Sequence, residues 1–255
     1  MDSAKKLPAV IFKVITIFPD FFKPMLEYGV FSRAYKKGLI GFETYDLRDF
    51  TNDNYKTVDD EPYGGGSGMV FKPVPLGKAI KKAKSKKEVK VVYLTPSGKV
   101  FNSDMAKELA QEDELVFICG RYEGIDQRIV DLYVDYEISI GDYVISGGEP
   151  AAMVVIDAVA RHVEGVVKEM DSVVKDSFYD GLLDYPHYTR PETYNGLKVP
   201  EVLLSGNHKR IELWREKMKL VETLTKRPDL LERAKLTEVQ KKLLKEIKAQ
   251  LRKLT

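Results

Sequence analysis

Apolar runs of strand length alternate with helix-length segments through the first two-thirds of the chain. Strands are expected at 10–18, 39–47, 89–94, 115–119 and 133–140. Helices are expected at 30–37, 74–87, 105–110, 125–132 and 150–161. Parallel strands are joined by crossover helices, so this alternation predicts an α/β fold with a mainly parallel sheet.

Three loops rich in glycine or proline follow predicted strands, and they begin at Thr95, Gly120 and Gly141. Open α/β sheets bind ligands at the carboxyl ends of their strands, and glycine allows the backbone to approach a ligand closely. The third loop ends in Gly147-Gly148 and leads into the predicted helix at 150–161, whose first N–H groups have no partner within the helix. On its own, a Gly-Gly pair more often marks a tight turn.

A glycine-rich segment at 62–69 carries four glycines within five residues. Its spacing matches neither a phosphate-binding loop nor a dinucleotide-binding fingerprint. The sequence leaves open whether this segment is a lid, a loop that contacts RNA, or a passive connection.

The regular pattern ends after His162, and residues 163–175 show no clear period. Helices are expected again at 209–224, 228–234 and 237–254, the last with a capping box from Thr237 to Gln240. We therefore predict an α/β domain at 1–162, a linker at 163–176 and a small helical domain at 177–255.

Charge is spread unevenly along the chain, although the whole carries only +2. Residues 205–255 hold 15 basic and 7 acidic residues, a net +8, whereas the remainder holds 26 and 32, a net −6. This asymmetry indicates a polyanionic partner or, equally, a solvated lysine-rich helix face.

The single cysteine, Cys119, rules out an intrachain disulfide framework and favours a cytoplasmic protein. The apolar run near the start is interrupted by Lys13 and Pro19. It is therefore too short for a signal peptide or a membrane span, and no membrane association is expected.

The usual catalytic patterns are missing, because the histidines and the cysteine lack metal-ligand spacing and no nucleophile elbow is present. Arg161, Asp176 and Asp184 remain as a cation and two carboxylates near the predicted linker. Asp176 is also typical of a helix N-cap, and Arg161 of a cation at a helix end.

Four segments, in this order, resemble the bacterial tRNA (guanine-N1)-methyltransferases of the SPOUT, or α/β-knot, group. They are CGRYEGIDQR at 119–128, EISIGDYVISGGE at 137–149, GLLDYPHYTRPE at 181–192 and VLLSGNH at 202–208. The resemblance runs from about residue 11 to the last predicted helix.

The resemblance implies a parallel sheet with a trefoil knot near its carboxyl end, followed by a small all-α domain. It implies a homodimer that uses S-adenosylmethionine as methyl donor and needs Mg²⁺ for turnover without a dedicated protein site. The positions that match the donor site are Tyr93, Leu94, Thr95, Pro96, Gly120, Arg121, Tyr122, Glu123, Ile140, Gly141, Asp142, Tyr143, Val144, Ile145, Gly147 and Gly148.

The substrate implied is the anticodon stem-loop of tRNA, methylated on guanine 37 beside guanine 36, a modification that maintains the reading frame. By matching position, Asp176 is the general base and Arg161 stabilises charge on the guanine O6. The residues implied to bind the substrate are Asp184, His187 and Arg190, which would shape the base or methionine end of the pocket, together with Ser205, Asn207, His208, Lys209 and Arg210.

Two alternatives remain open at this point. One is a SPOUT enzyme that methylates a ribose 2′-OH or another base. The other is a non-catalytic RNA-binding protein that keeps the donor-binding fold. No protein partner other than a second copy of the chain is expected.

Overall fold

The computed structural model describes residues 8–167 and 176–251. The chain divides into two compact units, residues 1–170 and 171–255, and each is described by itself. No helix in the described part of the chain is long and apolar enough to cross a bilayer.

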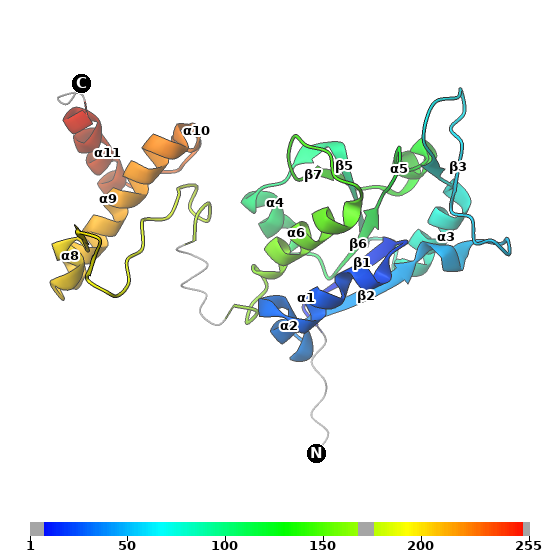
Figure 1. The fold of residues 1–255 in the computed structure, drawn as a ribbon, viewed down its shortest axis with the longest axis horizontal. Coiled ribbons are helices and arrows are strands. Elements are labelled where there is room, and N and C mark those ends of the chain that lie inside the picture. Colours follow the sequence, from blue (N-terminus) through cyan, green and yellow to red (C-terminus); the bar gives the residue numbers. More distant parts are fainter. Residues whose placement is uncertain (1–7, 168–175, 252–255) are drawn as a thin grey trace, which may run out of the picture. The chain divides into compact units, whose positions relative to one another are not determined.

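The first unit is built on a five-stranded sheet in the order β2-β1-β6-β5-β7 (Figure 1). Its strands are β1 (Val10–Thr16), β2 (Ile40–Asp46), β5 (Lys90–Val100), β6 (Glu114–Cys119) and β7 (Tyr136–Ser139). Every neighbouring pair is parallel, so the α/β fold expected from the sequence pattern is confirmed.

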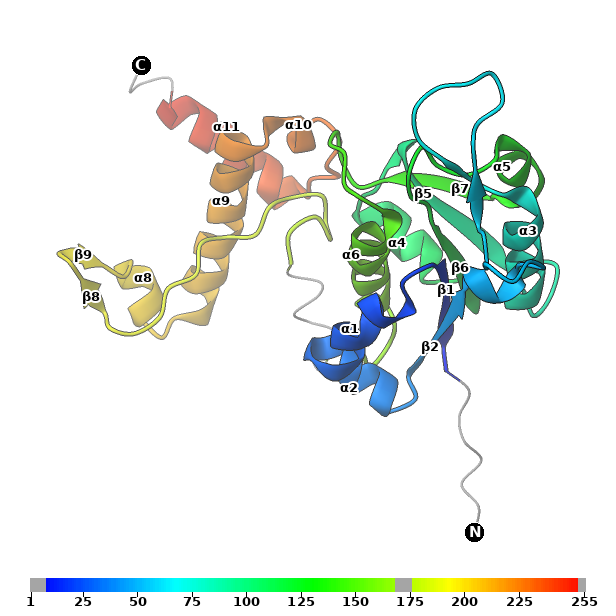
Figure 2. The same cartoon turned by 45° about the vertical axis from the view of Figure 1, so that its right-hand side comes forward.

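Helices cover both faces of this sheet (Figure 2). They are η1 (Pro19–Phe22), α1 (Lys23–Glu27), α2 (Gly29–Lys36), η2 (Leu47–Phe50), α3 (Pro73–Ala83), α4 (Ser103–Leu109), α5 (Gln127–Tyr133) and α6 (Gly148–Ala160). A short antiparallel pair, β3 (Asp59–Asp60) and β4 (Val70–Phe71), lies outside the sheet.

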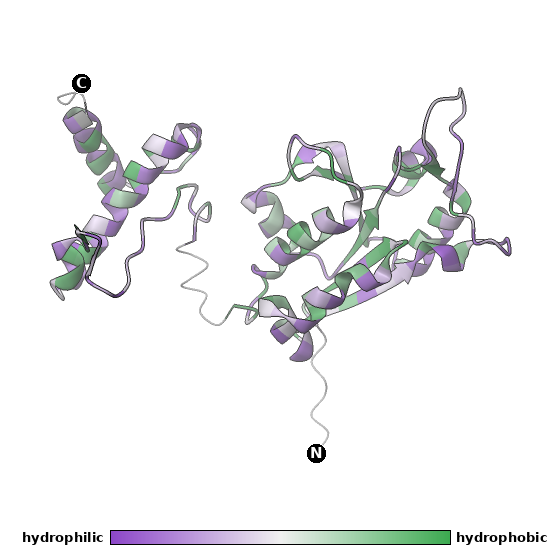
Figure 3. Cartoon of the chain, in the orientation of Figure 1, coloured by the Kyte–Doolittle hydropathy of each residue, from purple (hydrophilic) through white to green (hydrophobic). Residues whose placement is uncertain are grey.

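The alternating side chains of the strands divide the core into two layers. Phe12 and Val14 of β1 pack with α1, α2, α4 and α6, whereas Ile15 packs on the opposite face with α3 and α5. The strands are largely hydrophobic and the helices carry both kinds of residue (Figure 3), as expected when one face of each helix is buried. The result is a three-layer arrangement that leaves the strand ends accessible.

The predicted strand at 89–94 is longer in the structure, where β5 continues to Val100. Leu94 and Lys99 both pair with Ile138, so residues 95–98 leave the ladder between two strand segments. A Cβ on Gly98 would lie 2.4 Å from the backbone nitrogen of Ile138. Residue 98 must therefore be glycine, because residues 95–98 pass close to the backbone of β7 there.

Three predicted helix starts are wrong by two residues, and the first is that of α4, which begins at Ser103 rather than at residue 105. Helix α5 begins at Gln127 rather than at Ile125, because Asp126 caps it by accepting a hydrogen bond from the backbone nitrogen of Arg128 at 3.0 Å. Helix α6 begins at Gly148 rather than at Pro150, so Gly147 alone precedes it.

The second unit is helical in its described part apart from one short hairpin. Its elements are β8 (Thr193–Tyr194), β9 (Leu197–Lys198), α8 (Glu201–Leu204), α9 (His208–Lys226), α10 (Pro228–Leu231) and α11 (Glu238–Leu251). Its core contains Leu182, Leu220, Leu243 and Ile247. The predicted capping box is confirmed, since Thr237 and Gln240 exchange backbone-to-side-chain hydrogen bonds of 2.8 and 3.2 Å.

The predicted linker at 163–176 lies largely outside the described residues. Val163 and Val166, which do lie within them, are buried in the core of the first unit. The packing of this unit therefore extends past His162, because both valines cover the apolar side of the sheet that α6 also covers.

Candidate functional site

A pocket opens at the carboxyl ends of β5, β6 and β7, where the three predicted loops meet. The first group of lining residues is Tyr93, Leu94, Thr95, Pro96, Gly120, Arg121, Tyr122 and Glu123. The second group is Ile140, Gly141, Tyr143, Val144, Ile145, Gly147 and Gly148. The loops converge because β6, β5 and β7 are neighbours in a parallel sheet.

Asp142 is the exception among the predicted donor-site positions. It is exposed and does not line the pocket, because the backbone turns at Gly141 (φ +144°). Five further residues that line the pocket were not singled out from the sequence, namely Gly124, Ile138, Ser139, Ser146 and Ala151.

The pocket walls approach each other at backbone level. The nitrogen of Gly148 donates a hydrogen bond of 2.9 Å to the carbonyl oxygen of Gly120. A Cβ on Gly148 would lie 2.7 Å from the Cα of Cys119 and 3.1 Å from the nitrogen of Gly120. The two loops therefore join only because this position has no side chain.

Tyr93 forms part of the pocket wall, just before residues 95–98 leave the ladder within β5. A Cβ on Gly120 would lie 2.9 Å from its ring, and one on Gly124 would lie 3.0 Å from its hydroxyl oxygen. Burial raises the pKa of the Tyr93 hydroxyl above its ordinary value of about 10. The phenol is therefore neutral at physiological pH and keeps its proton for hydrogen bonding.

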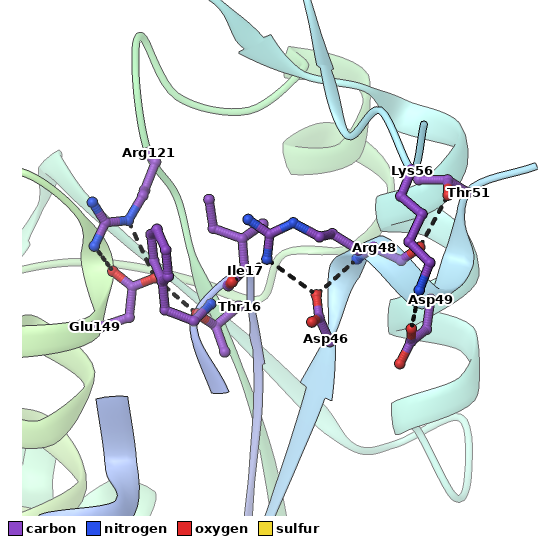
Figure 4. A network of polar contacts seen from close by, with 10 residues as sticks. Thr16, Ile17, Asp46, Arg48, Asp49, Thr51, Lys56, Arg121 and Glu149 are labelled. Atoms are coloured by element: carbon purple, nitrogen blue, oxygen red, sulfur yellow. Dashed lines mark hydrogen bonds and ion pairs between the residues drawn. The ribbon is translucent and has the colours of Figure 1, made fainter. Parts of the chain in front are cut away.

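A buried carboxylate, Glu149, supports the pocket by contacting Arg121, one of its lining residues (Figure 4). Its Oε1 accepts a hydrogen bond of 2.8 Å from Thr16, and its Oε2 lies 3.0 Å from Nη2 of Arg121. Arg121 in turn donates to the carbonyl of Ser146 at 3.2 Å. Glu149 thus connects the end of β1 with two pocket loops.

No role was predicted for Glu149 from the sequence. The available signal was an acidic residue directly after Gly147-Gly148, at the start of an otherwise apolar helix. That position suits a carboxylate near the positive end of a helix, but its partners come from distant parts of the chain.

Arg161 and Asp176, the predicted catalytic pair, belong to different units. Arg161 ends α6, where its backbone nitrogen donates to the carbonyl of Asp157 at 3.2 Å. Asp176 begins the described part of the second unit, and its carbonyl accepts from Tyr179 at 3.3 Å. The residues after Asp176 form turns, so the N-cap alternative for this residue does not apply.

The segment that follows Asp176 is attached to α9. Lys219, which is buried, forms an ion pair with Asp180, and Thr223 accepts a hydrogen bond of 2.9 Å from the backbone nitrogen of Leu183. These contacts hold the turn that follows Asp176 against α9.

The predicted substrate-binding residues lie in the second unit and differ in their surroundings. Asp184 and His187 form a pair of 2.9 Å, and the ring of His187 lies 4.7 Å from that of Tyr185. Asn207 caps α9 by accepting from the nitrogen of Arg210 at 3.2 Å, and Ser205 donates to the carbonyl of Val202 at 2.7 Å. All residues of the set are exposed except Asp184, which is half-buried.

The capping contacts explain Ser205 and Asn207 without a ligand. Among the described residues, no group of three His, Cys, Asp or Glu side chains is placed to hold a metal ion.

Fold and pocket together define a three-layer α/β protein with a pocket at the edge of a parallel sheet where such folds bind ligands. Residues 10–233 match the model of the family described as tRNA (Guanine-1)-methyltransferase TrmD. The chain therefore belongs to this family.

Relatives named tRNA (guanine-N(1)-)-methyltransferase are similar over nearly their full length. The protein of Sulfurihydrogenibium sp. is 55% identical over 235 residues, which cover 92% of each chain. The protein of Dictyoglomus turgidum is 51% identical over 94% of this chain and 97% of its own. That of Buchnera aphidicola is 52% identical over 93% and 91%, respectively.

Proposed function

We propose that this protein transfers a methyl group from S-adenosylmethionine to N1 of guanine 37 in tRNA, and so supports reading-frame maintenance. The observation that carries the proposal is the glycine-lined pocket at the strand ends, in a chain that belongs to a family named for this methylation. A cytoplasmic location follows from the substrate.

The chemistry of the pocket suits an adenosyl ligand. Apolar side chains, among them Leu94, Ile138 and Ile140, line the pocket together with glycines such as Gly120 and Gly141. An apolar ring with hydrogen-bonding edges matches such a lining, since backbone N–H and C=O groups read those edges. When bound, the donor supplies an electrophilic methyl group on a sulfonium.

Two residues of the chain are then assigned to the reaction at guanine, which accepts the methyl group. Guanine N1 carries a proton at neutral pH, so its lone pair is not available until a base removes that proton. We assign this role to Asp176, and we assign to Arg161 the stabilisation of the negative charge that develops on O6.

Mg²⁺ is proposed as a turnover requirement without a dedicated protein cage. Hard oxygen ligands from RNA phosphates and water are sufficient for this ion, which commonly keeps several waters.

The trefoil knot implied by the family is also part of this proposal, and we place it where the loops after β5, β6 and β7 interlock.

The proposed enzyme is a homodimer in which each active site uses residues of both chains. Sedimentation velocity at micromolar concentration is therefore expected to detect only dimers in the active preparation. An active monomer would contradict the shared site, because one chain would then complete it alone.

The basic carboxyl-terminal region is proposed to bind the tRNA backbone. Lys209 and Arg210 are exposed in the first turn of α9. Reversing both to glutamate is expected to weaken tRNA binding and to reduce its salt dependence, since each phosphate contact releases counterions. Donor binding, measured by calorimetry, is expected to stay unchanged.

A matched control is the reversal of Lys81 and Lys82, which are exposed on α3 in the first unit. This control removes the same charge and is expected to affect tRNA binding much less. If the two double reversals weaken binding equally, a general charge effect explains the result and the assignment of α9 fails.

The proposed function itself is tested by methyl transfer from labelled donor to unmodified tRNA transcripts, followed by nucleoside analysis. We expect 1-methylguanosine at position 37. A 2′-O-methyl nucleoside or another methylated base would favour a different SPOUT activity, and absence of any product with bound tRNA would favour the non-catalytic alternative. A chelator added to the same assay tests the Mg²⁺ requirement.

A further inference from the structure

Asp176 lies at the start of a closed loop that runs from residue 176 to residue 184. The backbone nitrogen of Phe178 donates a hydrogen bond of 2.7 Å to the carbonyl oxygen of Leu182. The backbone nitrogen of Asp184 donates one of 2.9 Å to Oγ of Ser177. The second bond joins the two ends of the loop directly beside Asp176, so the position of this residue depends on how the whole loop is held.

The backbone of this loop is strained close to Asp176. Phe178, two residues further on, has a φ of +73°. This left-handed conformation is uncommon for a residue with a bulky side chain, and such strain persists only where surrounding contacts stabilise it. The loop therefore depends on contacts with the rest of its unit.

Two side chains of α9 make those contacts, and we call Lys219 and Thr223 the α9 clamp. Nζ of Lys219 donates to Oδ2 of Asp180, whose Oδ1 accepts 3.1 Å from the backbone nitrogen of Leu182. Oγ1 of Thr223 accepts from the backbone nitrogen of Leu183 at 2.9 Å and donates to the carbonyl oxygen of Lys219 at 2.7 Å. The two clamp residues are four positions apart, so they lie on one face of the helix.

Apolar packing alone would not define the position of the loop. The buried Leu182 belongs to the same core cluster as Leu220 of α9, but hydrophobic burial has no preferred direction. Hydrogen bonds do have one. The clamp therefore fixes the register of the loop on the helix, which the leucines by themselves leave variable.

The Lys219–Asp180 pair contributes little to stability for the position it occupies. Lys219 is 6% exposed, whereas the side chain of Asp180 is 36% exposed. Removing an ammonium group from water costs free energy even when it is paired, and apolar residues at such positions are often equally or more stabilising. Stability therefore does not account for this lysine, whereas a positioning role does.

We propose that Lys219 and Thr223 are positioning residues for the methyl transfer, which hold the loop 176–184 on α9 so that Asp176 reaches guanine N1. The inference rests on the proposed function, in which Asp176 is the general base, and it adds two residues that act through this base without touching either substrate.

The length of α9 gives the clamp its importance. Lys209 and Arg210, which we propose to contact the tRNA backbone, lie in the first turn of the same continuous helix, His208–Lys226. Residue 219 follows about 15 Å further along it. RNA bound at the first turn and the loop that carries the base are thus held by one helix. An error of about 1 Å in the position of a reacting group can lower a rate about 100-fold.

The first test is Lys219→Met, which keeps an unbranched side chain without the charge. The variant should fold, because Asp180 is left within reach of water. We expect the single-turnover rate at saturating tRNA and donor to fall by up to about 100-fold. The dissociation constants for tRNA and S-adenosylmethionine should stay unchanged, since Lys219 is assigned to neither ligand. A wild-type rate in folded Lys219→Met would overturn the proposal.

The decisive measurement repeats this substitution in the Asp176→Asn background. If Lys219 acts through Asp176, the double variant should react no more slowly than Asp176→Asn alone. A general loss of folded protein would instead lower the rate by the same factor in both backgrounds. Equal factors would therefore overturn the proposal.

Thr223→Val and Thr223→Ser form an independent pair, which decides the question even if Lys219→Met does not fold. Valine keeps the shape of threonine but removes the acceptor for the backbone nitrogen of Leu183, whereas serine keeps the hydroxyl. We expect a rate loss with valine that disappears in the Asp176→Asn background, and a rate near that of wild type with serine. Equal losses with both residues would assign the effect to packing and overturn the proposal.

Gln240→Ala is the matched control for stability, because Gln240 is buried in the same unit. Its side chain caps α11 through Thr237 and donates to Glu216 at 2.8 Å, and both partners lie outside the loop. This variant should melt at a lower temperature and keep the wild-type single-turnover rate. A loss as large as that of Lys219→Met would overturn the positioning role.

The proposed function is judged separately, by the product of the wild-type protein. If wild type forms 1-methylguanosine while Lys219→Met lowers the rate equally in both backgrounds, only the positioning role fails.

Discussion

Replacing Asp176 with asparagine is expected to lower the turnover rate by about 10²–10⁴-fold, the usual contribution of a general base. The amide keeps the size of the side chain but cannot take the proton from guanine N1. Binding of S-adenosylmethionine should hardly change, because the proposed donor contacts lie in the three loops of the first unit. Single-turnover methyl transfer and calorimetry measure the two effects separately.

The pH dependence of Asp176→Asn provides a second criterion. As pH rises, a larger fraction of guanine loses its N1 proton to solvent, so the deficit of the variant should shrink. Asp229→Asn, which removes a carboxylate exposed in the same unit, is the matched control and should be as active as wild type. A near wild-type rate for Asp176→Asn at neutral pH would assign the base elsewhere, and Asp184 would be tested next.

The Gly148→Ala substitution is expected to have the second large effect, on donor binding. The added Cβ would lie 2.7 Å from the Cα of Cys119, and neither backbone can move without losing the 2.9 Å hydrogen bond from Gly148 to Gly120. Overpacking of this kind costs about 1–3 kcal/mol, so donor affinity should fall by up to roughly 100-fold. Calorimetry on the folded variant measures the loss.

The matched control is Gly77→Ala, another glycine-to-alanine change in a helix of the same unit. Its Cβ would meet Ile129 at 3.6 Å, an ordinary contact, and alanine favours helix over glycine. This variant should bind the donor normally and melt at the same or a higher temperature. Normal donor affinity in a folded Gly148→Ala protein would mean that donor binding does not depend on the close approach of the two loops.

Local sequence pattern was sufficient for the five strands of the sheet and for most of the helices. The alternation through Phe12, Val14 and Ile15 sends side chains to both faces of the sheet, and the glycines at 120 and 141 mark where strands give way to loops. These features depend on neighbours in the chain, so they are readable before the fold is known. Parallel strand order then makes the loops meet at one edge.

Segment ends were less predictable, because they depend on particular contacts. Because Asp126 caps α5, this helix begins two residues later than predicted. In β5, residues 95–98 leave the ladder, and Lys99 then pairs with the same residue as Leu94. Asp142 lies next to a lining residue and still points outside the pocket. A difference of one or two residues in such turns reverses the direction of a side chain.

Only the tertiary structure revealed the supports behind the site. Thr16 and Glu149 are 133 residues apart in sequence, yet their hydrogen bond supports Arg121 in the lining of the pocket. The hydrogen bond from Arg48 to the carbonyl of Ile17 likewise joins two residues that follow neighbouring strands, β2 and β1. The sequence by itself determined which residues form strands, helices and glycine loops, because those preferences are local. The tertiary structure decided which charges are buried, paired or left open, because those properties depend on distant segments brought together by the fold.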